Sequence, residues 1–382
     1  MQFLYEQGPI RPPSEAKSLL VRVTRNCPWN KCAFCHTYRG TKFQIRKVED
    51  VKKDIKTARE IADTIREISW KMGQSGEINE YVVNHIYHDG ESFDDSYRSV
   101  AAWLYFGGTS VFLQDADTII MKTADLVDVI SFVKDQFPAV DRITSYCRSK
   151  TACRKSVEEF KKLKEAGLSR IHIGLESGYD PLLKFIDKGV TAEEHVKGGR
   201  NIVESGISLS EYVIPGLGGE KWSKEHAEET AKVLNRINPD YIRLRSLQVR
   251  YNTELYKMRE EGIFTKLSDE DVVKEIQLFI KNLDGIQSRV ISDHILNLLE
   301  ELEGKLPEDK EKLLGIIDRY FELPEGDRII YRLGRRKGIY RCLDDLSDMR
   351  VYHMLKTIVD EYKKKGVGAL DRDLNRIMHR FI

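Results

Sequence analysis

Three cysteines lie close together near the start of the chain, in the stretch Cys27-Pro-Trp-Asn-Lys-Cys32-Ala-Phe-Cys35. The remaining three cysteines are scattered, at Cys147, Cys153 and Cys342. Six cysteines in 382 residues are too few for a disulfide framework, so we expect reduced thiols. Because the thiolate is the form of cysteine that binds metals, three of them on one loop predict a metal ion or an iron–sulfur cluster.

The fourth ligand decides between these two kinds of centre. A structural zinc site needs a further Cys or His at a regular distance, and His36 follows Cys35 too closely to close the same tetrahedron. A [4Fe–4S] cluster held by three cysteines leaves one iron open to an external ligand. An open position is typical of catalytic metal sites, so the cluster is favoured, with a non-catalytic zinc module as the alternative.

The elements that carry this loop alternate between strands and helices. Residues 18–23 read as a strand that leads directly into the cysteines, and a helix with apolar residues at steps of three and four follows from Val48 to Ile68. A later helical pattern closes at Gly167, a typical C-cap. Further strands are expected at 109–113, 142–146, 170–175, 211–214 and 241–247. Six strand–helix units predict an α/β fold, a partial (β/α)6 TIM-like barrel with parallel strands.

The chain divides into three parts on this interpretation, and the second part carries an insertion. Residues 1–17 form an N-terminal extension and residues 18–265 form the barrel. The segment at about 73–108 is too long for an ordinary connection and is expected to be a helical insertion that covers the barrel mouth. Residues 266–382 are strongly charged and helical in pattern, which predicts a C-terminal helical domain or cap.

Composition excludes several classes of protein. With 41% hydrophobic and 32% charged residues, the chain is neither disordered nor a membrane protein. A net charge of +1 argues against a protein that coats nucleic acid by electrostatics alone. The N-terminus lacks the pattern of a signal peptide, and the most apolar stretch, 101–113, is too short to span a bilayer, so we expect a cytoplasmic protein.

The cysteine loop resembles that of the radical S-adenosylmethionine (SAM) superfamily. Those enzymes carry a C-x3-C-x2-C loop after the first strand of a partial barrel, with an aromatic residue before the third cysteine. Here the first spacing is one residue longer, and Phe34 is the aromatic residue. The resemblance implies that Cys27, Cys32 and Cys35 bind a [4Fe–4S] cluster and that Phe34 lies against the adenine of SAM.

The second strand departs from the family pattern. The usual Gly-Gly-Glu motif, which meets the SAM amino group, is replaced by Leu113-Gln114-Asp115-Ala116-Asp117. The resemblance implies that Asp115 or Asp117 accepts hydrogen bonds from the ammonium group, a charge-assisted contact. The alternative is a strand end with solvated acids.

The fourth strand matches better, with Ile173-Gly174-Leu175-Glu176-Ser177-Gly178 followed by Lys188-Gly189. It is similar to a segment of coproporphyrinogen dehydrogenases, tRNA methylthiotransferases and nitrogenase-cofactor maturases. The resemblance implies that Glu176 faces SAM and that Lys188 pairs with its carboxylate, which needs a cation beside an electron-rich cluster. The alternative is a surface ion pair.

The remaining strand ends complete the implied SAM site. After the fifth strand, the backbone of Pro215 and Gly216 is expected to edge the adenine, because glycine lets the main chain approach a ligand. By the same resemblance, ribose and adenine contacts fall to Ser145, Arg148 and Arg245. Ser292, Asp293, His294 and Asn297 follow the barrel and either line its open end or cap a helix.

The resemblance implies a radical SAM enzyme of the iron–sulfur oxidoreductase type that works under anaerobic conditions. The cluster accepts one electron from a donor such as flavodoxin or ferredoxin and passes it to SAM. SAM splits, and the 5′-deoxyadenosyl radical abstracts a hydrogen atom from a substrate that is expected to be a small molecule. Its rival is RNA modification through the basic run Arg332 to Lys337. No catalytic residue beyond the cofactor site is assigned, and no membrane partner is expected.

Overall fold

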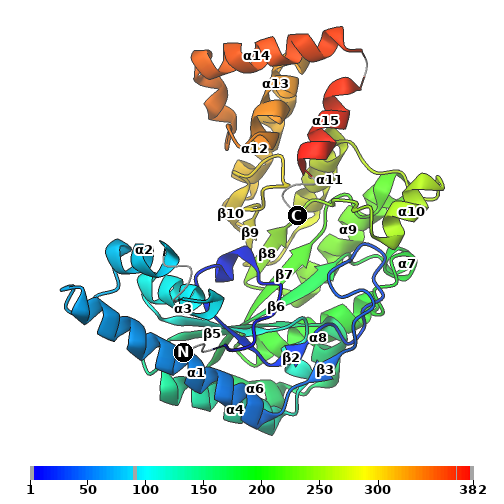
Figure 1. Cartoon of the computed structure of the whole chain (residues 1–382). Helices are drawn as coiled ribbons and strands as arrows, with labels where there is room; N and C mark the ends of the chain where they lie inside the picture. The colour runs from blue at the N-terminus through cyan, green and yellow to red at the C-terminus, as the bar shows by residue number, and fades with distance from the viewer. Residues whose placement is uncertain (1–3, 89–92, 367, 379–382) are drawn as a thin grey trace. The chain divides into compact units, whose positions relative to one another are not determined.

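The computed structural model describes residues 4–88, 93–366 and 368–378. Strands and helices alternate along much of the chain (Figure 1), and the strands form one large sheet and one small sheet. Six strands match the expected ones within a few residues: β1 Leu19–Arg22, β4 Ser110–Gln114, β5 Arg142–Cys147, β6 Leu168–Glu176, β7 Ser208–Val213 and β8 Tyr241–Leu244. The short strands β2 Thr24–Arg25 and β3 Gln44–Ile45 pair with each other instead.

The eight strands of the main sheet follow the order β1-β4-β5-β6-β7-β8-β9-β10. The pairs β1–β4, β4–β5, β5–β6, β7–β8 and β8–β9 are parallel. Parallel sheets are covered on both faces, which explains why the consecutive residues Leu19, Leu20 and Val21 of β1 are all buried. The predicted α/β class with a mostly parallel sheet is confirmed.

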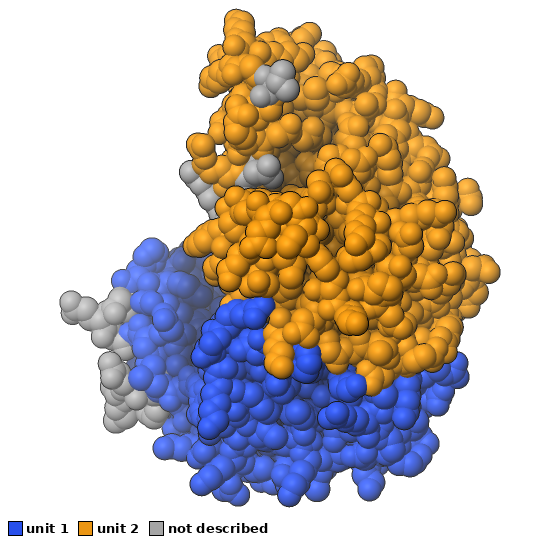
Figure 2. Space-filling model, turned by 90° about the vertical axis from the view of Figure 1, so that its right-hand side faces the viewer, with its two compact units in different colours: residues 1–30, 37–173, 197–209 blue, residues 31–36, 174–196, 210–382 orange. Residues whose placement is uncertain are grey.

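Contacts divide the chain into two compact units, coloured separately in Figure 2. The first comprises residues 1–30, 37–173 and 197–209, and the second residues 31–36, 174–196 and 210–382. Strand β6 and helix α8 (Ala192–Glu204) each contribute residues to both units. The cysteine loop is likewise shared, since Cys27 belongs to the first unit and Cys32 and Cys35 to the second.

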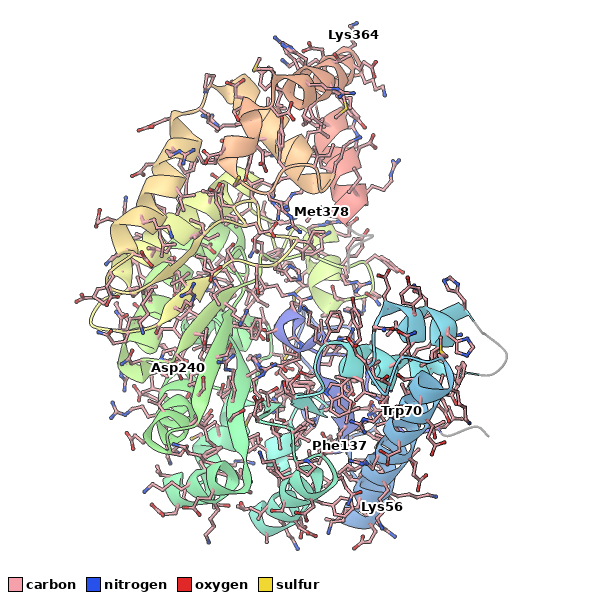
Figure 3. The ribbon with its side chains drawn as sticks, turned by 90° about the vertical axis from the view of Figure 1, so that its left-hand side faces the viewer. Lys56, Trp70, Phe137, Asp240, Lys364 and Met378 are labelled. Carbon is pink, nitrogen blue, oxygen red and sulfur yellow. The ribbon has the colours of Figure 1, made fainter. Side chains whose placement is uncertain are left out.

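The first unit contains the helical insertion. Helix α1 (Val48–Lys71), on which Figure 3 labels Lys56 and Trp70, buries the predicted apolar stripe, including Val51, Ile55 and Ile61. The helices of the insertion are α2 (Glu80–His88) and α3 (Asp95–Tyr105). The other helices of this unit are α4 (Thr123–Gln136), α5 (Ser149–Arg154) and α6 (Val157–Ala166).

The second unit contains an element that the sequence pattern did not predict. Within the expected helical region after residue 266, strands β9 (Arg289–Ile291) and β10 (Glu303–Lys305) extend the sheet. Three-residue strands are too short to show a period of two, so helical patterns on either side mask them. The helices of the second unit are α7 (Asp180–Phe185), α9 (Gly219–Ile237), α10 (Glu254–Glu260), α11 (Asp269–Asn282), α12 (Lys310–Glu322), α13 (Glu325–Arg336), α14 (Met349–Lys364) and α15 (Ala369–Met378).

Candidate cofactor site

The second half of the cysteine loop is fixed by backbone hydrogen bonds at Ala33. The Ala33 amide donates to the carbonyl of Ile186 at 2.8 Å, and its carbonyl accepts from the amide of Leu255 at 2.9 Å. The Cys35 amide donates to the Cys32 carbonyl at 3.1 Å, which forms a tight turn between the two thiols. These backbone hydrogen bonds therefore fix Ala33, which lies between Cys32 and Cys35 in the chain.

The thiols have the chemistry that an iron–sulfur cluster requires. Cys27, Cys32 and Cys35 are each partly exposed. Within residues 4–88, 93–366 and 368–378, no three or more His, Cys, Asp or Glu side chains are gathered closely enough to hold a metal ion. The donor set of three soft thiols on nine residues still fits a cluster by its ligand type.

Glu176 and Lys188 form an ion pair beside Phe34 in the second unit. The Lys188 Nζ lies 3.0 Å from Glu176 Oε1, and both side chains are 13% exposed. The same Nζ lies 5.9 Å from the centre of the Phe34 ring. Gly174 leaves room for the pair, because a Cβ there would lie 2.1 Å from Glu176 Oε1. The structure thus brings together three residues that the sequence analysis assigned to SAM binding, namely Phe34 and the largely buried pair of Glu176 and Lys188.

Glu211, on β7, was missed by the sequence analysis. It is 1% exposed, and neither of its carboxyl oxygens has a hydrogen-bond partner among the described residues. Burial, followed by the charge of Glu176, raises its pKa well above the usual value, while Lys188 lowers it. A buried polar group without a partner requires an explanation. The sequence does contain one sign of this residue: in a strand, Glu211 shares a face with the apolar residues Leu209 and Val213.

The turn after β7 is held by a buried carboxyl group. Gly216, with φ of 86°, donates its amide hydrogen to Glu275 Oε1 at 2.6 Å. The Ser223 hydroxyl donates to the other oxygen of Glu275, also at 2.6 Å. Burial raises the pKa of Glu275 to about 7, although both hydrogen bonds lower it. The predicted Pro215–Gly216 turn is therefore fixed in place by α11.

A buried histidine joins the same turn to the end of β6. His226 Nε2 lies 3.0 Å from the carbonyl oxygen of Ile214, which can only accept, so Nε2 carries the hydrogen. Nδ1 then accepts from the Ser177 hydroxyl at 2.9 Å. Burial lowers the pKa of His226 to about 4, so the ring is neutral near pH 7. This neutral ring positions the backbone after β6 and β7.

The loop after β8 places basic residues near His36 and His294. Arg250 Nη1 donates to His36 Nε2 at 2.7 Å. Burial, then Arg250 and Arg245, lowers the pKa of His36. Burial and then Arg245 lower the pKa of His294 to about 3. The exposed Arg245 thus lies in the second unit, close to the residue that follows the third cysteine.

Residues after β9 brace this loop and cap no helix. Asn297 accepts from the Ser246 amide at 2.8 Å and donates to the Leu244 carbonyl at 2.8 Å. Asp293 forms an ion pair with Arg243 at 2.9 Å. Of the two expectations for residues 292–297, the helix cap is wrong, because no helix follows them before residue 310 in the described chain.

In the first unit, the predicted carboxylates already have protein partners. Asp115 is fully buried between Arg22, at 2.6 Å, and the Tyr38 hydroxyl, at 2.8 Å. Asp117 accepts from the Arg148 amide at 3.1 Å and from the Thr151 hydroxyl at 2.5 Å. Burial raises the pKa of Asp117 to about 6. These acids are not solvated, and both hold the loops that follow the strands.

The other two predicted contacts of the first unit differ in exposure. The Ser145 hydroxyl is fully buried and donates to the Leu113 carbonyl at 3.0 Å. The Arg148 guanidinium lies 5.4 Å from the centre of the Trp29 ring, two residues after Cys27. Of Ser145 and Arg148, it is therefore Arg148 that lies next to the part of the cysteine loop in the first unit.

Arg335 and Arg336 of the predicted basic run are buried in α13, whereas Arg332 is partly exposed and Lys337, after the helix, is exposed. Arg335 and Arg336 are 2% and 5% exposed. Arg336 donates to the Leu296 carbonyl at 2.6 Å and pairs with Asp269 at 2.8 Å, while Arg335 pairs with Glu300 at 2.8 Å. The helical period turns these side chains inward, so they form neither a surface for RNA nor a solvated charge run.

Comparison with known proteins decides the family. The family model of the Radical SAM superfamily matches residues 21–234, more than half of the chain. The chain belongs to the radical SAM superfamily. Members of this superfamily use a [4Fe–4S] cluster and SAM, so the predicted family and its cofactors are confirmed. No helix in the described part of the chain is long and apolar enough to cross a membrane.

The chain is also similar to individual proteins. A tRNA uridine(34) acetyltransferase of Methanocaldococcus infernus is 27% identical over 127 residues, which are 32% of this chain and 23% of that protein. The chain therefore spans about a quarter of the length of the curated relative. The structure of an N-terminally truncated Elp3 of Methanocaldococcus infernus matches with a TM-score of 0.40 and 16% identity, covering 61% of this chain and 55% of that one. Coproporphyrinogen III oxidase (HemN) of Escherichia coli matches with a TM-score of 0.42 and 13% identity, covering 66% and 50%.

Proposed function

We propose that this radical SAM protein is an iron–sulfur oxidoreductase-type enzyme that acts on a small molecule. Cys27, Cys32 and Cys35 hold the cluster, which, when bound and reduced, supplies the electron that cleaves SAM to the 5′-deoxyadenosyl radical, the species that abstracts hydrogen from the substrate. The observation that carries the proposal is the buried Glu176–Lys188 pair beside Phe34. A flavodoxin or ferredoxin is the proposed electron donor.

The residues of the second unit bind SAM by charge and shape. Lys188 neutralises the carboxylate of SAM, and Glu176 holds the ammonium of Lys188 in position. Phe34 lies against the adenine, and the backbone of Pro215 and Gly216 edges the same ring. Arg245, exposed after β8, contacts the nucleoside.

Glu211 supplies the hydrogen bonds for the ribose. Both oxygens of its carboxyl group are unpartnered among the described residues, burial raises its pKa well above the usual value, and Glu176 and Lys188 both act on that pKa. The two ribose hydroxyl groups can form hydrogen bonds with this carboxyl group without adding charge. Without such a ligand, a carboxyl group buried in apolar surroundings destabilises the folded protein.

The first unit positions the loops. Because Asp115, Asp117 and Ser145 are buried and hydrogen-bonded to protein, we assign them to holding the ends of the strands. Arg148, against Trp29, remains the proposed SAM contact of this unit.

Formation of 5′-deoxyadenosine tests the proposal. The protein is reconstituted with iron and sulfide without oxygen, reduced with dithionite and mixed with SAM. We expect 5′-deoxyadenosine from the wild type and none from Cys32→Ala, with Cys153→Ala as the matched control that keeps activity. Bound zinc in place of iron, with no cleavage, would overturn the proposal in favour of a non-catalytic metal-binding module.

RNA modification is the second candidate. It is favoured by the similarity to a tRNA uridine(34) acetyltransferase, and it loses support from the burial of Arg335 and Arg336. An RNA substrate would require binding that weakens steeply with added salt. Absence of such binding to transfer RNA leaves the small-molecule proposal in place.

A further inference from the structure

A cavity of about 440 Å³ lies inside the second unit, apart from the Glu176–Lys188 pair. Its walls come from the loop after β8, the first turn of α11 and the C-terminal helices α13 and α15. Met378, labelled in Figure 3 near the end of α15, is one of the lining residues. This volume is in the range of cavities that hold small organic ligands.

One part of the lining is apolar. Leu247, Ile276, Leu298 and Leu374 are 9% exposed or less and face the cavity from four different segments. Side chains from separate segments that leave such a space unfilled are unusual in a well-packed interior. They suit the hydrocarbon part of a ligand.

The charges of the lining are largely paired with each other. Asp269 pairs with Arg336 at 2.8 Å and with Arg332 at 3.3 Å, and Arg332 also pairs with Asp371 at 2.6 Å. Arg259 pairs with the neighbouring Glu260 at 2.8 Å. These contacts leave little unpaired negative charge on the side of the cavity formed by α11 and α13.

Lys266 is the one cation of the described lining without such a partner, and the Glu220 carboxylate likewise lines the cavity without an ion pair. Among the described residues, the ammonium group of Lys266 makes no hydrogen bond and no ion pair within 4.0 Å, although it lines the cavity. Burial lowers its pKa, Asp269 raises it, and Arg336 and Arg259 lower it further. An ammonium in a partly dehydrated position, near Arg336 and Arg259 as well as Asp269, is stabilised by a bound anion.

The cavity also adjoins the proposed SAM turn. Leu247 and Val272 line it, and a Cβ on Gly216 would lie 3.2 Å from Val272 Cγ2 and 3.7 Å from Leu247 Cβ. The Leu247 amide donates to the Pro215 carbonyl at 2.8 Å. Only one layer of atoms therefore separates the Pro215–Gly216 backbone from the cavity.

The geometry points to a substrate-binding cavity for a small amphiphilic anion, with the carboxylate or phosphate on Lys266 and the apolar body between Leu247, Ile276 and Leu298. The assignment of this ligand as the substrate rests on the proposed function. The anion-binding property of the cavity does not, since it follows from the lining alone.

Calorimetric titration of the full-length reconstituted protein tests this inference. The probes are hexanoate, hexyl phosphate and the neutral 1-hexanol, and the variants are Lys266→Met, Lys266→Arg and the exposed control Lys257→Met. We expect one of the anions to bind about tenfold or more tightly than 1-hexanol to the wild type and to Lys257→Met. The preference is lost in Lys266→Met and restored in Lys266→Arg.

Equal binding of the anions and 1-hexanol, or an unchanged preference in Lys266→Met, would overturn the inference. The relative affinity of hexanoate and hexyl phosphate tells which anionic group the cavity prefers. Failure of the proposed function is seen separately, as absence of 5′-deoxyadenosine in an assay that contains none of these probes.

Discussion

The carboxyl group of Glu211 is buried at a cost to the folded state. A buried polar group without a hydrogen bond destabilises a protein by about 1–3 kcal/mol, and a residue retained at that cost is expected to serve binding. Glu211→Leu should therefore raise the free energy of unfolding by about 1 kcal/mol or more while SAM affinity falls about tenfold. Urea unfolding and equilibrium dialysis with SAM measure the two effects. Glu211→Gln, which keeps hydrogen-bonding capacity, should retain most of the affinity, and a Leu variant that binds SAM normally contradicts the assignment.

Lys188 is expected to act through charge. Lys188→Met should weaken SAM binding by about tenfold to a hundredfold, the range of a charge-assisted hydrogen bond. Lys184→Met, an exposed position on α7, is the matched control and should bind SAM as the wild type does. Equilibrium dialysis under anaerobic conditions gives both dissociation constants. Lys188→Met that binds SAM as tightly as Lys184→Met does would show that the ion pair with Glu176 is only structural.

Glu275 makes stability depend on pH. The pKa of Glu275 in the folded protein, about 7, lies above the ordinary value of 4.5. Its contribution to the free energy of unfolding is therefore complete below pH 4.5 and is lost as pH rises through 7. Relative to Glu275→Gln, the wild type should lose about 3 kcal/mol of unfolding free energy over this window. Urea unfolding at a series of pH values measures the difference between the two proteins. A difference that stays constant with pH would show that Glu275 is not held protonated.

At the scale of elements, α6 shows what a local pattern can specify. Ser156 accepts from the Glu159 amide at 3.2 Å, and Glu159 in turn accepts from the Ser156 amide at 3.0 Å. Ser156→Ala should lower the free energy of unfolding by about 1 kcal/mol. Thr64→Ala, within α1, serves as the control for loss of a hydroxyl on a helix. Equal destabilisation of both variants would contradict the capping role.

Local patterns predicted the parallel strands and the helices that follow them, because each is long enough to show its period. The strands β9 and β10 were not predicted, because three residues show no periodicity and the pairing of these strands is set by tertiary contacts. The basic run of α13 was misread for a related reason. Sequence gives the charge of Arg335 and Arg336, while the carbonyl groups and carboxylates that surround them come from distant segments.

The same distinction applies within the candidate site. Glu176, Lys188 and Phe34 were found because the family motif marks them, and the second unit brings them together. Glu211 carries no motif, and the lack of hydrogen-bond partners for its oxygens among the described residues is visible only in the structure. The cavity beside Lys266 is formed by segments more than a hundred residues apart, so no local pattern could indicate it.

At the scale of the whole molecule, the account depends on a cluster with one open iron. The most direct test is the electron paramagnetic resonance spectrum of the reconstituted, dithionite-reduced protein before and after addition of SAM. We expect the signal of a reduced [4Fe–4S] cluster whose g values shift when SAM binds, and loss of the signal in Cys32→Ala. A spectrum that SAM leaves unchanged, or a signal that persists in Cys32→Ala, would contradict the account.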